Sequence, residues 1–203
     1  VNNKIAILGQ KVSIGDKIKI QQSTLVVDDL SKTHHQHLIY NKPEGEICSK
    51  NDPGGRKTTF SALPRLNNLR WISIGRLDIN TSGLLLFTTD GTIANQWMHP
   101  SNGYEREYMV RIYGKYKSNI EKSMINGINL SDGMAKFKTI TQIQDANNKK
   151  WFKVTVDEGR NRFIKRMFEH HGIKVSRLIR IRFGDIILPT DLKKGQYKIV
   201  SEL

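Results

Sequence analysis

Asp78 is the residue of this chain whose surroundings are best suited to chemistry. It lies in the segment Gly75-Arg76-Leu77-Asp78-Ile79-Asn80-Thr81-Ser82-Gly83, which a glycine brackets at each end. A loop of this kind can present one carboxylate rigidly, while the bare glycine backbone leaves room for a substrate. A carboxylate held in this way can act as a nucleophile or as a base. The spacing alone equally allows a structural loop, in which local hydrogen bonds satisfy the carboxylate.

A run of basic residues is the second candidate feature. Between Arg160 and Arg182 the chain has eight Lys and Arg residues and one acid, Glu169. The basic members are Arg160, Arg162, Lys165, Arg166, Lys174, Arg177, Arg180 and Arg182. A charge run is often only a solvated face, but it can also contact nucleic-acid phosphates. Lys165 falls at the edge of an apolar helical stripe, where its long side chain can reach a cleft.

The composition of the whole chain points to a polyanionic partner. Its 203 residues include 33 Lys and Arg against 19 Asp and Glu, a formal net charge of +14. A surplus of this size favours nucleic acid, because each neutralised phosphate releases counterions. The single cysteine, Cys48, excludes an internal disulfide and a Cys-based zinc site, and fits a reducing cytosol. No apolar run approaches the roughly 20 residues of a membrane span, and residues 1–20 show no signal peptide.

Apolar patterns and turn signals predict the elements that must position these residues. Strands are predicted at 4–8, 17–20, 84–88, 107–113, 151–156 and 175–182. Helices are predicted at 92–99, where Pro100 should end the helix, and from Phe163 to a stop at Gly172. Residues 31–36 are polar and make a linker. The chain is therefore expected to be α+β, rich in strands and mainly antiparallel.

The segment around Asp78 resembles a family signature. The string Gly-Arg-Leu-Asp-x-x-Thr-Ser-Gly-Leu-Leu-Leu-x-Thr-x-Asp-Gly, which begins at Gly75, is similar to that of the RsuA-type pseudouridine synthases. The resemblance extends from about Leu38 to the C-terminus. It includes Lys42-Pro43-x-Gly45, Gly55-Arg56, Leu63-Pro64, His99-Pro100, Glu105-Arg106-Glu107-Tyr108, Glu158-Gly159-Arg160-Asn161-Arg162, Arg177-Leu178-Ile179-Arg180, Gly184-Asp185-Ile186 and Leu188-Pro189. The segments 87–91 and 176–182 look closest to the branch that acts on the large ribosomal subunit.

The resemblance implies a fold and a domain organisation. Residues 37–203 would form the family's α+β catalytic domain, a long, mainly antiparallel mixed sheet flanked by helices. Residues 1–30 are similar to the C-terminal part of an S4-type RNA-binding module, on Val-Asn-x-Lys, Leu-Gly and Val-x-x-Gly-Asp-x-Ile between Val1 and Ile18. The helices of such a module would precede residue 1. Residues 31–36 would link the two parts.

The resemblance also implies a reaction. The chain would isomerise a uridine of ribosomal RNA to pseudouridine, in 23S rRNA or a large-subunit precursor. The bond from N1 to C1′ breaks, the base turns, and C5 joins C1′. Asp78 either attacks C1′ or removes a ribose proton so that a glycal forms. No cofactor is expected, because substrate and product are isomers, and the six histidines suggest no metal site. We expect a cytoplasmic monomer that does not associate with membranes.

Residue roles follow from the same resemblance. Asp78 matches the catalytic aspartate, Tyr108 the tyrosine that packs against the target base, and Lys165 the cation that pairs with the aspartate. Arg76 matches an arginine that enters the RNA stack when the target nucleotide is extruded. Further contacts with RNA are expected from Gly75, Leu77, Arg160, Arg162, Ile164, Arg166, Arg177 and Arg180. From the residues alone, Tyr108 could be a core aromatic, Lys165 a solvated side chain and Arg76 a partner of Asp78 or Asp90.

Two other functions remain open from the sequence. One is a catalytically silent factor on the same fold, which binds ribosomal RNA or assists ribosome assembly. It would keep the basic face but tolerate the loss of Asp78 or Tyr108. A nuclease would require a metal-binding carboxylate cluster or a catalytic histidine pair, and the sequence shows neither.

Overall fold

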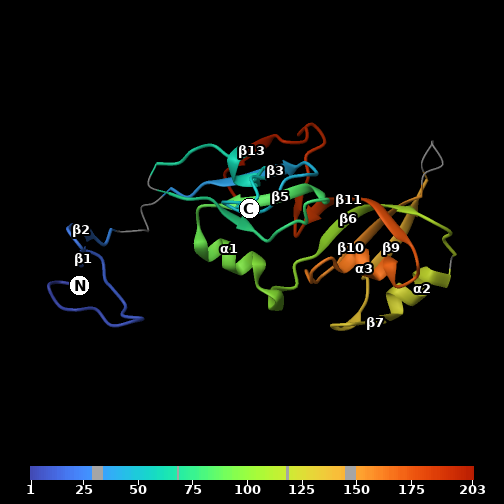
Figure 1. The fold of residues 1–203 in the computed structure, drawn as a ribbon, viewed down its shortest axis with the longest axis horizontal. Coiled ribbons are helices and arrows are strands. Elements are labelled where there is room, and N and C mark those ends of the chain that lie inside the picture. Colours follow the sequence, from blue (N-terminus) through green and yellow to red (C-terminus); the bar gives the residue numbers. More distant parts are fainter. Residues whose placement is uncertain (29–33, 68, 118, 145–149) are drawn as a thin grey trace. The chain divides into compact units, whose positions relative to one another are not determined.

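The computed structural model describes residues 1–203 except 29–33, 68, 118 and 145–149. The chain divides into two compact units, Val1–His35 and Gln36–Leu203 (Figure 1). Residues 31–33 of the predicted linker lie outside the described residues, and residues 34–36 have no regular secondary structure. In the part that the structure describes, no helix is long and apolar enough to cross a membrane.

The smaller unit contains one antiparallel hairpin, formed by β1 (Lys17–Ile20) and β2 (Ser23–Val26). The strand predicted at 4–8 is wrong. The chain turns there instead, with φ of 50° at Asn2 and 64° at Asn3, and the Lys4 N–H donates to the Val1 carbonyl at 2.9 Å. Alternation over five residues could not reveal this, because asparagine tolerates the left-handed conformation that starts the turn.

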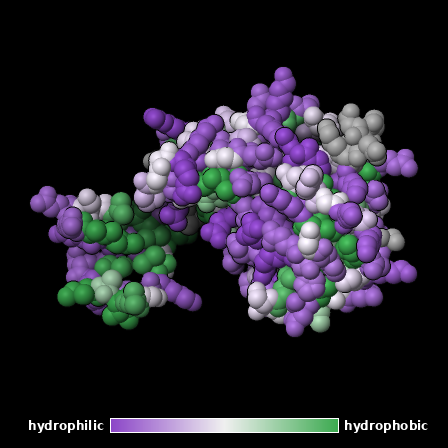
Figure 2. Space-filling view, turned by 45° about the vertical axis from the view of Figure 1, so that its right-hand side comes forward, coloured by the Kyte–Doolittle hydropathy of each residue, from purple (hydrophilic) through white to green (hydrophobic). Residues whose placement is uncertain are grey.

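Apolar side chains lie on the surface of this unit (Figure 2). Each of eight is at least 40% exposed: Ile5, Ile7, Leu8, Val12, Ile14, Ile20, Leu25 and Val26. A two-stranded hairpin has too little area to bury them within itself.

Nine strands among the described residues form one sheet in the larger unit. Its main path is β13-β3-β5-β11-β6-β10-β9, while β4 pairs with β5 and β12 with β11. The bounds are β3 His37–Lys42, β4 Ile72–Ile74, β5 Ser82–Thr88, β6 Arg106–Tyr113, β9 Thr139–Ile143, β10 Trp151–Val156, β11 Lys174–Phe183, β12 Ile186–Ile187 and β13 Tyr197–Val200. Of these pairings between described strands, β5 with β11 is parallel and the others are antiparallel. The predicted mixed, mainly antiparallel α+β fold is confirmed.

Three α-helices, the 3-10 helices η2 (Thr59–Ala62) and η3 (Pro100–Asn102) and a second hairpin complete the described part of this unit. Their bounds are α1 Gly91–Met98, α2 Asn119–Asn126, α3 Phe163–Glu169, β7 Ile128–Leu130 and β8 Gly133–Ala135. The carboxylate of Asp90 caps α1 by accepting from the Thr92 N–H at 2.8 Å, which explains why the helix begins there. Helix α3 buries its apolar side chains in the core, as the helical spacing predicted.

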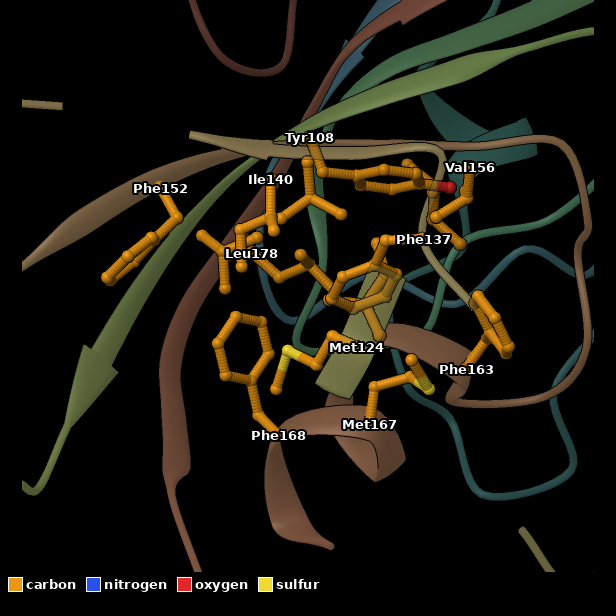
Figure 3. Packing of buried hydrophobic residues seen from close by; sticks show 14 of the residues in the cluster. Tyr108, Met124, Phe137, Ile140, Phe152, Val156, Phe163, Met167, Phe168 and Leu178 are labelled. Carbon is orange, nitrogen blue, oxygen red and sulfur yellow. The ribbon is translucent and has the colours of Figure 1, made fainter. Parts of the chain in front are cut away.

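Strand β5 is buried on both faces, because its alternate residues belong to two different core clusters. Leu85 and Phe87 belong to the larger cluster, whereas Leu84 and Leu86 belong to the smaller one. The larger cluster also includes α3 and the inner side chains of β6 and β10 (Figure 3). This double burial accounts for the uninterrupted apolar run in the sequence.

Gly83 lies where β5 meets β11, opposite Arg180. Its φ is +99°, and a Cβ at this position would be 2.2 Å from the Arg180 carbonyl oxygen. No side chain fits there unless the two strands separate. The glycine that ends the Asp78 loop is therefore required by the central pairing of the sheet.

Gly83→Ala should destabilise the protein by about 3 kcal/mol or more, because it adds a backbone clash to a strained φ. Urea denaturation measures this change. Gly91→Ala is the matched control, because a Cβ there has ordinary space, with Ile72 Cδ1 at 3.9 Å. Equal urea midpoints for the two variants would contradict the close approach of β5 and β11.

Candidate active site

The loop between β4 and β5 carries Asp78 at the edge of a cavity of about 1140 Å³. The Asp78 side chain is 31% exposed. The cavity is also bordered by Gly75, Arg76, Leu77, Tyr108, Arg160 and Ile164. The sheet thus brings the Gly-bounded loop, β6 and α3 to one hollow of the surface.

Lys42, the last residue of β3, anchors this loop through its side chain. Its side chain is fully buried, and its ammonium donates to the carbonyls of Asp78 at 3.2 Å, Ile79 at 3.4 Å and Thr81 at 2.9 Å, with a fourth bond to Pro43. Burial lowers the pKa of Lys42. A charge inside a protein needs such dipoles around it, so the loop backbone and the ammonium fix each other.

Lys165 reaches Asp78 from α3. Its ammonium donates to Oδ2 of Asp78 at 3.2 Å, across a sequence separation of 87 residues. The Lys165 side chain is only 10% exposed. The structure therefore brings together the two residues that the family resemblance paired. A charge-assisted hydrogen bond of this kind orients the carboxylate toward the cavity.

Tyr108 borders the cavity and also belongs to the core. It lies in β6, is 9% exposed, and is found at the edge of the larger cluster beside Val156 (Figure 3). Ile164 of α3 and Leu178 of β11 are similarly buried and border the same cavity. Together they form an apolar wall on which a flat base can lie.

Arg76 is exposed at the start of the loop and borders the cavity. None of the ion pairs among the described residues involves it. A salt bridge from Arg76 to Asp78 or Asp90, which the sequence left open, is therefore not formed among the described residues. Leu77, its neighbour, is 7% exposed and anchors the loop in the core.

Three arginines of the basic run, at or just before α3, pair with acids. Arg160 pairs with Glu158 and with Asp132, and Arg166 donates to the other oxygen of Asp132 at 2.8 Å. Arg162 pairs with Glu169 at 2.7 Å, where both side chains are about half exposed. Of these arginines, Arg160 and Arg162 border the cavity and Arg166 does not.

Two of the three arginines of β11, Arg177 and Arg180, differ in their placement. Arg177 is 42% exposed, with Glu44 at 4.0 Å. Arg180 is 2% exposed, and its Nε donates to the Leu84 carbonyl at 2.7 Å. Arg180 is therefore not part of a solvated face, but it borders the cavity, and its contact with RNA stays a prediction. Arg180 follows Leu178 by two residues and so shares its buried face of the strand.

Sequence reasoning missed two basic residues at this site. Lys42 belongs to the Lys-Pro-x-Gly motif, but no neighbouring residue in the sequence indicates that its side chain is buried. Arg106 borders the cavity and donates to the carbonyls of Tyr104 at 3.1 Å and Asp157 at 3.2 Å. Burial lowers the pKa of Arg106. No group of three or more His, Cys, Asp or Glu in the described part of the chain is arranged to hold a metal ion.

Lys42→Met should destabilise the protein by about 3 kcal/mol, because it removes one donor from each of four carbonyls around a buried position. Hydrogen exchange at the Thr81 and Gly45 N–H groups, which donate to the loop carbonyls of Asp78 and Ile79, should become faster. Denaturation and exchange measurements check the two effects. Lys50→Met, at an exposed lysine, is the control. Unchanged exchange at Thr81 in Lys42→Met would show that the ammonium does not hold the loop.

Comparisons with known proteins add to this geometry. The family model of RNA pseudouridylate synthase matches residues 36–170. The chain is 48% identical over 197 residues to "Ribosomal large subunit pseudouridine synthase B" of Salmonella typhi, covering 96% of this chain and 68% of that protein. It is 46% identical over 203 residues to the protein of the same name from Pseudomonas aeruginosa, of which it spans 53%.

Solved structures show the same likeness. A crystal structure of a pseudouridylate synthase superposes with a TM-score of 0.74 at 28% identity, over 98% of this chain and 83% of that one. The archaeal box H/ACA Nop10–Cbf5 complex superposes with a TM-score of 0.58 over 80% of this chain, but at 18% identity it shows a common fold alone. On the family match, the close relatives and the shared fold, this chain belongs to the RNA pseudouridylate synthase family.

Proposed function

We propose that this protein isomerises a uridine to pseudouridine in large-subunit ribosomal RNA, either 23S rRNA or its precursor, with Asp78 as the essential carboxylate. The observation that carries the proposal is the Asp78 carboxylate at the cavity edge, held by Lys165 at 3.2 Å. The names of the bacterial relatives support the choice of large-subunit RNA.

In the proposed reaction, Asp78 acts on the ribose of the target nucleotide. Its carboxylate either attacks C1′ or removes a ribose proton, and in both routes the bond from C1′ to N1 breaks. The base turns within the cavity. C5 then bonds to C1′ as the bond between Asp78 and C1′ breaks, or, in the glycal route, as Asp78 returns the ribose proton. The proton on C5 is finally lost and N1 gains one, so atoms and charge balance without an external reactant. Lys165 keeps the carboxylate pointed at the sugar throughout.

The apolar wall retains the detached base. Tyr108 offers a ring face, and Ile164 and Leu178 supply surface with no fixed hydrogen-bond pattern. A base can therefore rotate against this wall without breaking polar contacts. Arg76 is exposed beside Asp78, and we assign it to the gap that the extruded nucleotide leaves in the RNA stack.

The RNA backbone is assigned to the basic side chains around the cavity. Arg160 and Arg162 border the cavity. Arg177 is exposed at the surface, and Arg166 does not border the cavity. The net charge of +14 supplies the long-range attraction. Action on ribosomal RNA would place the protein in the cytoplasm. The larger unit contains all of the proposed catalytic residues, so a monomer suffices.

The test is pseudouridine mapping in large-subunit RNA incubated with and without the protein. Asp78→Asn should abolish product, because the amide cannot act as nucleophile or base, and should bind RNA within a few-fold of the unsubstituted protein. Asp191→Asn, at an exposed acid, is the control and should retain activity. Clear turnover by Asp78→Asn would move the chemistry to another residue. RNA binding without product from the unsubstituted protein would support a silent assembly factor.

Lys165→Met should lower kcat by about 100-fold or more, in the range for loss of one charged active-site group, with RNA affinity nearly unchanged. Lys165→Arg should keep part of the activity, because arginine keeps a cation beside Asp78, though one of different shape. Single-turnover kinetics and Kd measurements separate the two effects. Lys174→Met, at an exposed lysine, controls for lost charge. A parallel loss of RNA affinity and kcat would make Lys165 a phosphate contact instead.

A further inference from the structure

A second tyrosine, Tyr104, borders the cavity, and it lies outside the proposed catalytic loop. Tyr104 is stacked on Trp97, with ring centroids 4.6 Å apart and an interplanar angle of 6°. Trp97 is 8% exposed and does not border the cavity, whereas Tyr104 is partly exposed and does. Trp97 therefore covers one face of the Tyr104 ring from behind.

The stacked pair is held firmly from several sides. The Phe183 ring packs edge-on against both, at 5.5 Å from Trp97 and 6.3 Å from Tyr104. Gly184 closes the back, since a Cβ there would be 3.0 Å from Trp97 and 3.2 Å from Tyr104. Arg106 fixes the Tyr104 backbone through a hydrogen bond to its carbonyl at 3.1 Å. The orientation of the ring is thus set before any ligand arrives.

The surroundings of Tyr104 fit a nucleobase. Met98, which is 40% exposed, and His99 border the same cavity. Neither supplies a row of fixed donors and acceptors that would select one base. An aromatic face next to exposed apolar and basic groups is the usual platform for an unstacked base in single-stranded RNA.

The cavity has room for more than one nucleotide. Its volume of about 1140 Å³ exceeds the 300–1000 Å³ that pockets for whole small molecules span. The cavity is bordered by two tyrosine rings, Tyr108 beside the Asp78 loop and Tyr104 against Trp97. One extruded uridine can occupy only the first of these positions.

We propose that Tyr104 stacks on a nucleobase next to the target uridine, as a second base position of the same cavity. This inference rests on the proposed function for the identity of the first base. When the target nucleotide leaves the stack, its neighbour loses a stacking partner, and Tyr104 supplies a replacement. Because every base has a π-face, the position selects RNA that is unpaired beside the target and tolerates any base there.

The experiment measures Kd for fragments of 23S rRNA that the full chain binds, with single abasic substitutions scanned along each fragment. Tyr104→Leu keeps apolar bulk on Trp97 but lacks the ring, and it should weaken binding by about 5- to 150-fold. Tyr104→Phe should bind like the unsubstituted protein. At one position, the abasic substitution should weaken the unsubstituted protein by a similar factor and leave Tyr104→Leu no weaker than before. Tyr113→Ala, at a 78% exposed tyrosine of β6, is the matched control.

The outcomes separate this inference from the proposed function, because product formation is measured on the same fragments. Coupling between Tyr104 and one base supports the second position whether or not pseudouridine appears. Turnover without such coupling, or equal losses for Tyr104→Leu at every abasic position, overturns it. Absence of RNA binding by the unsubstituted protein overturns both. Thermal unfolding of each variant excludes a general loss of structure, and Tyr104→Phe tests the ring if Tyr104→Leu does not fold.

Discussion

The buried ammonium of Lys42 is the interaction on which the geometry of the proposed active site depends. An amine with no solvent exposure is unfavourable unless nearby dipoles solvate it. Here the dipoles are the carbonyls of the loop that carries Asp78, together with that of Pro43. A loop conformation that moved its carbonyls away would leave the ammonium with the Pro43 carbonyl alone. The cost of burying one charge thus selects one position for the carboxylate, and the loop needs no rigidity of its own.

The sheet then determines what faces this carboxylate. Strand β11 pairs with β5 on one side and with β6 on the other, so the Asp78 loop and Tyr108 lie near the same central strands. Gly83 allows the closest approach in this arrangement, where its missing side chain would meet the Arg180 backbone. Helix α3 adds Lys165, whose ammonium bonds to the Asp78 carboxylate. The strand order and the missing side chain at Gly83 therefore bring together four segments that are far apart in the sequence.

Local patterns predicted the elements with strong apolar signals and missed those whose burial depends on distant partners. The run 84–88 and the spacing of Phe163 to Phe168 identified β5 and α3, because both bury most of their side chains. Helix α2 has one fully buried side chain, Met124, so its apolar stripe is weak. The available signals for this helix were Ile120, one turn before Met124, and Gly127, just beyond the end of the helix. The buried positions of Lys42 and Arg180 could not be inferred, because the acceptors that make them tolerable are 36 and 96 residues away. The contact of Asp78 with Lys165 came from family resemblance, not from spacing.

The pairing of β3 with β13 affects when the proposed active site can form during synthesis. Strand β3 ends in Lys42, and it pairs along its other edge with Tyr197–Val200, while Asn41 also bonds to the carbonyl of Leu192. During synthesis the ribosome releases these residues long after the Asp78 loop and Tyr108 have emerged. Pairings of such large sequence separation form late, because closing long loops is entropically costly. A nascent chain that already contains Asp78, Tyr108 and Lys165 would thus still lack the pairing that braces the strand ending in Lys42. The proposed active site is therefore completed only after residues 197–200 have been synthesised and have paired with β3.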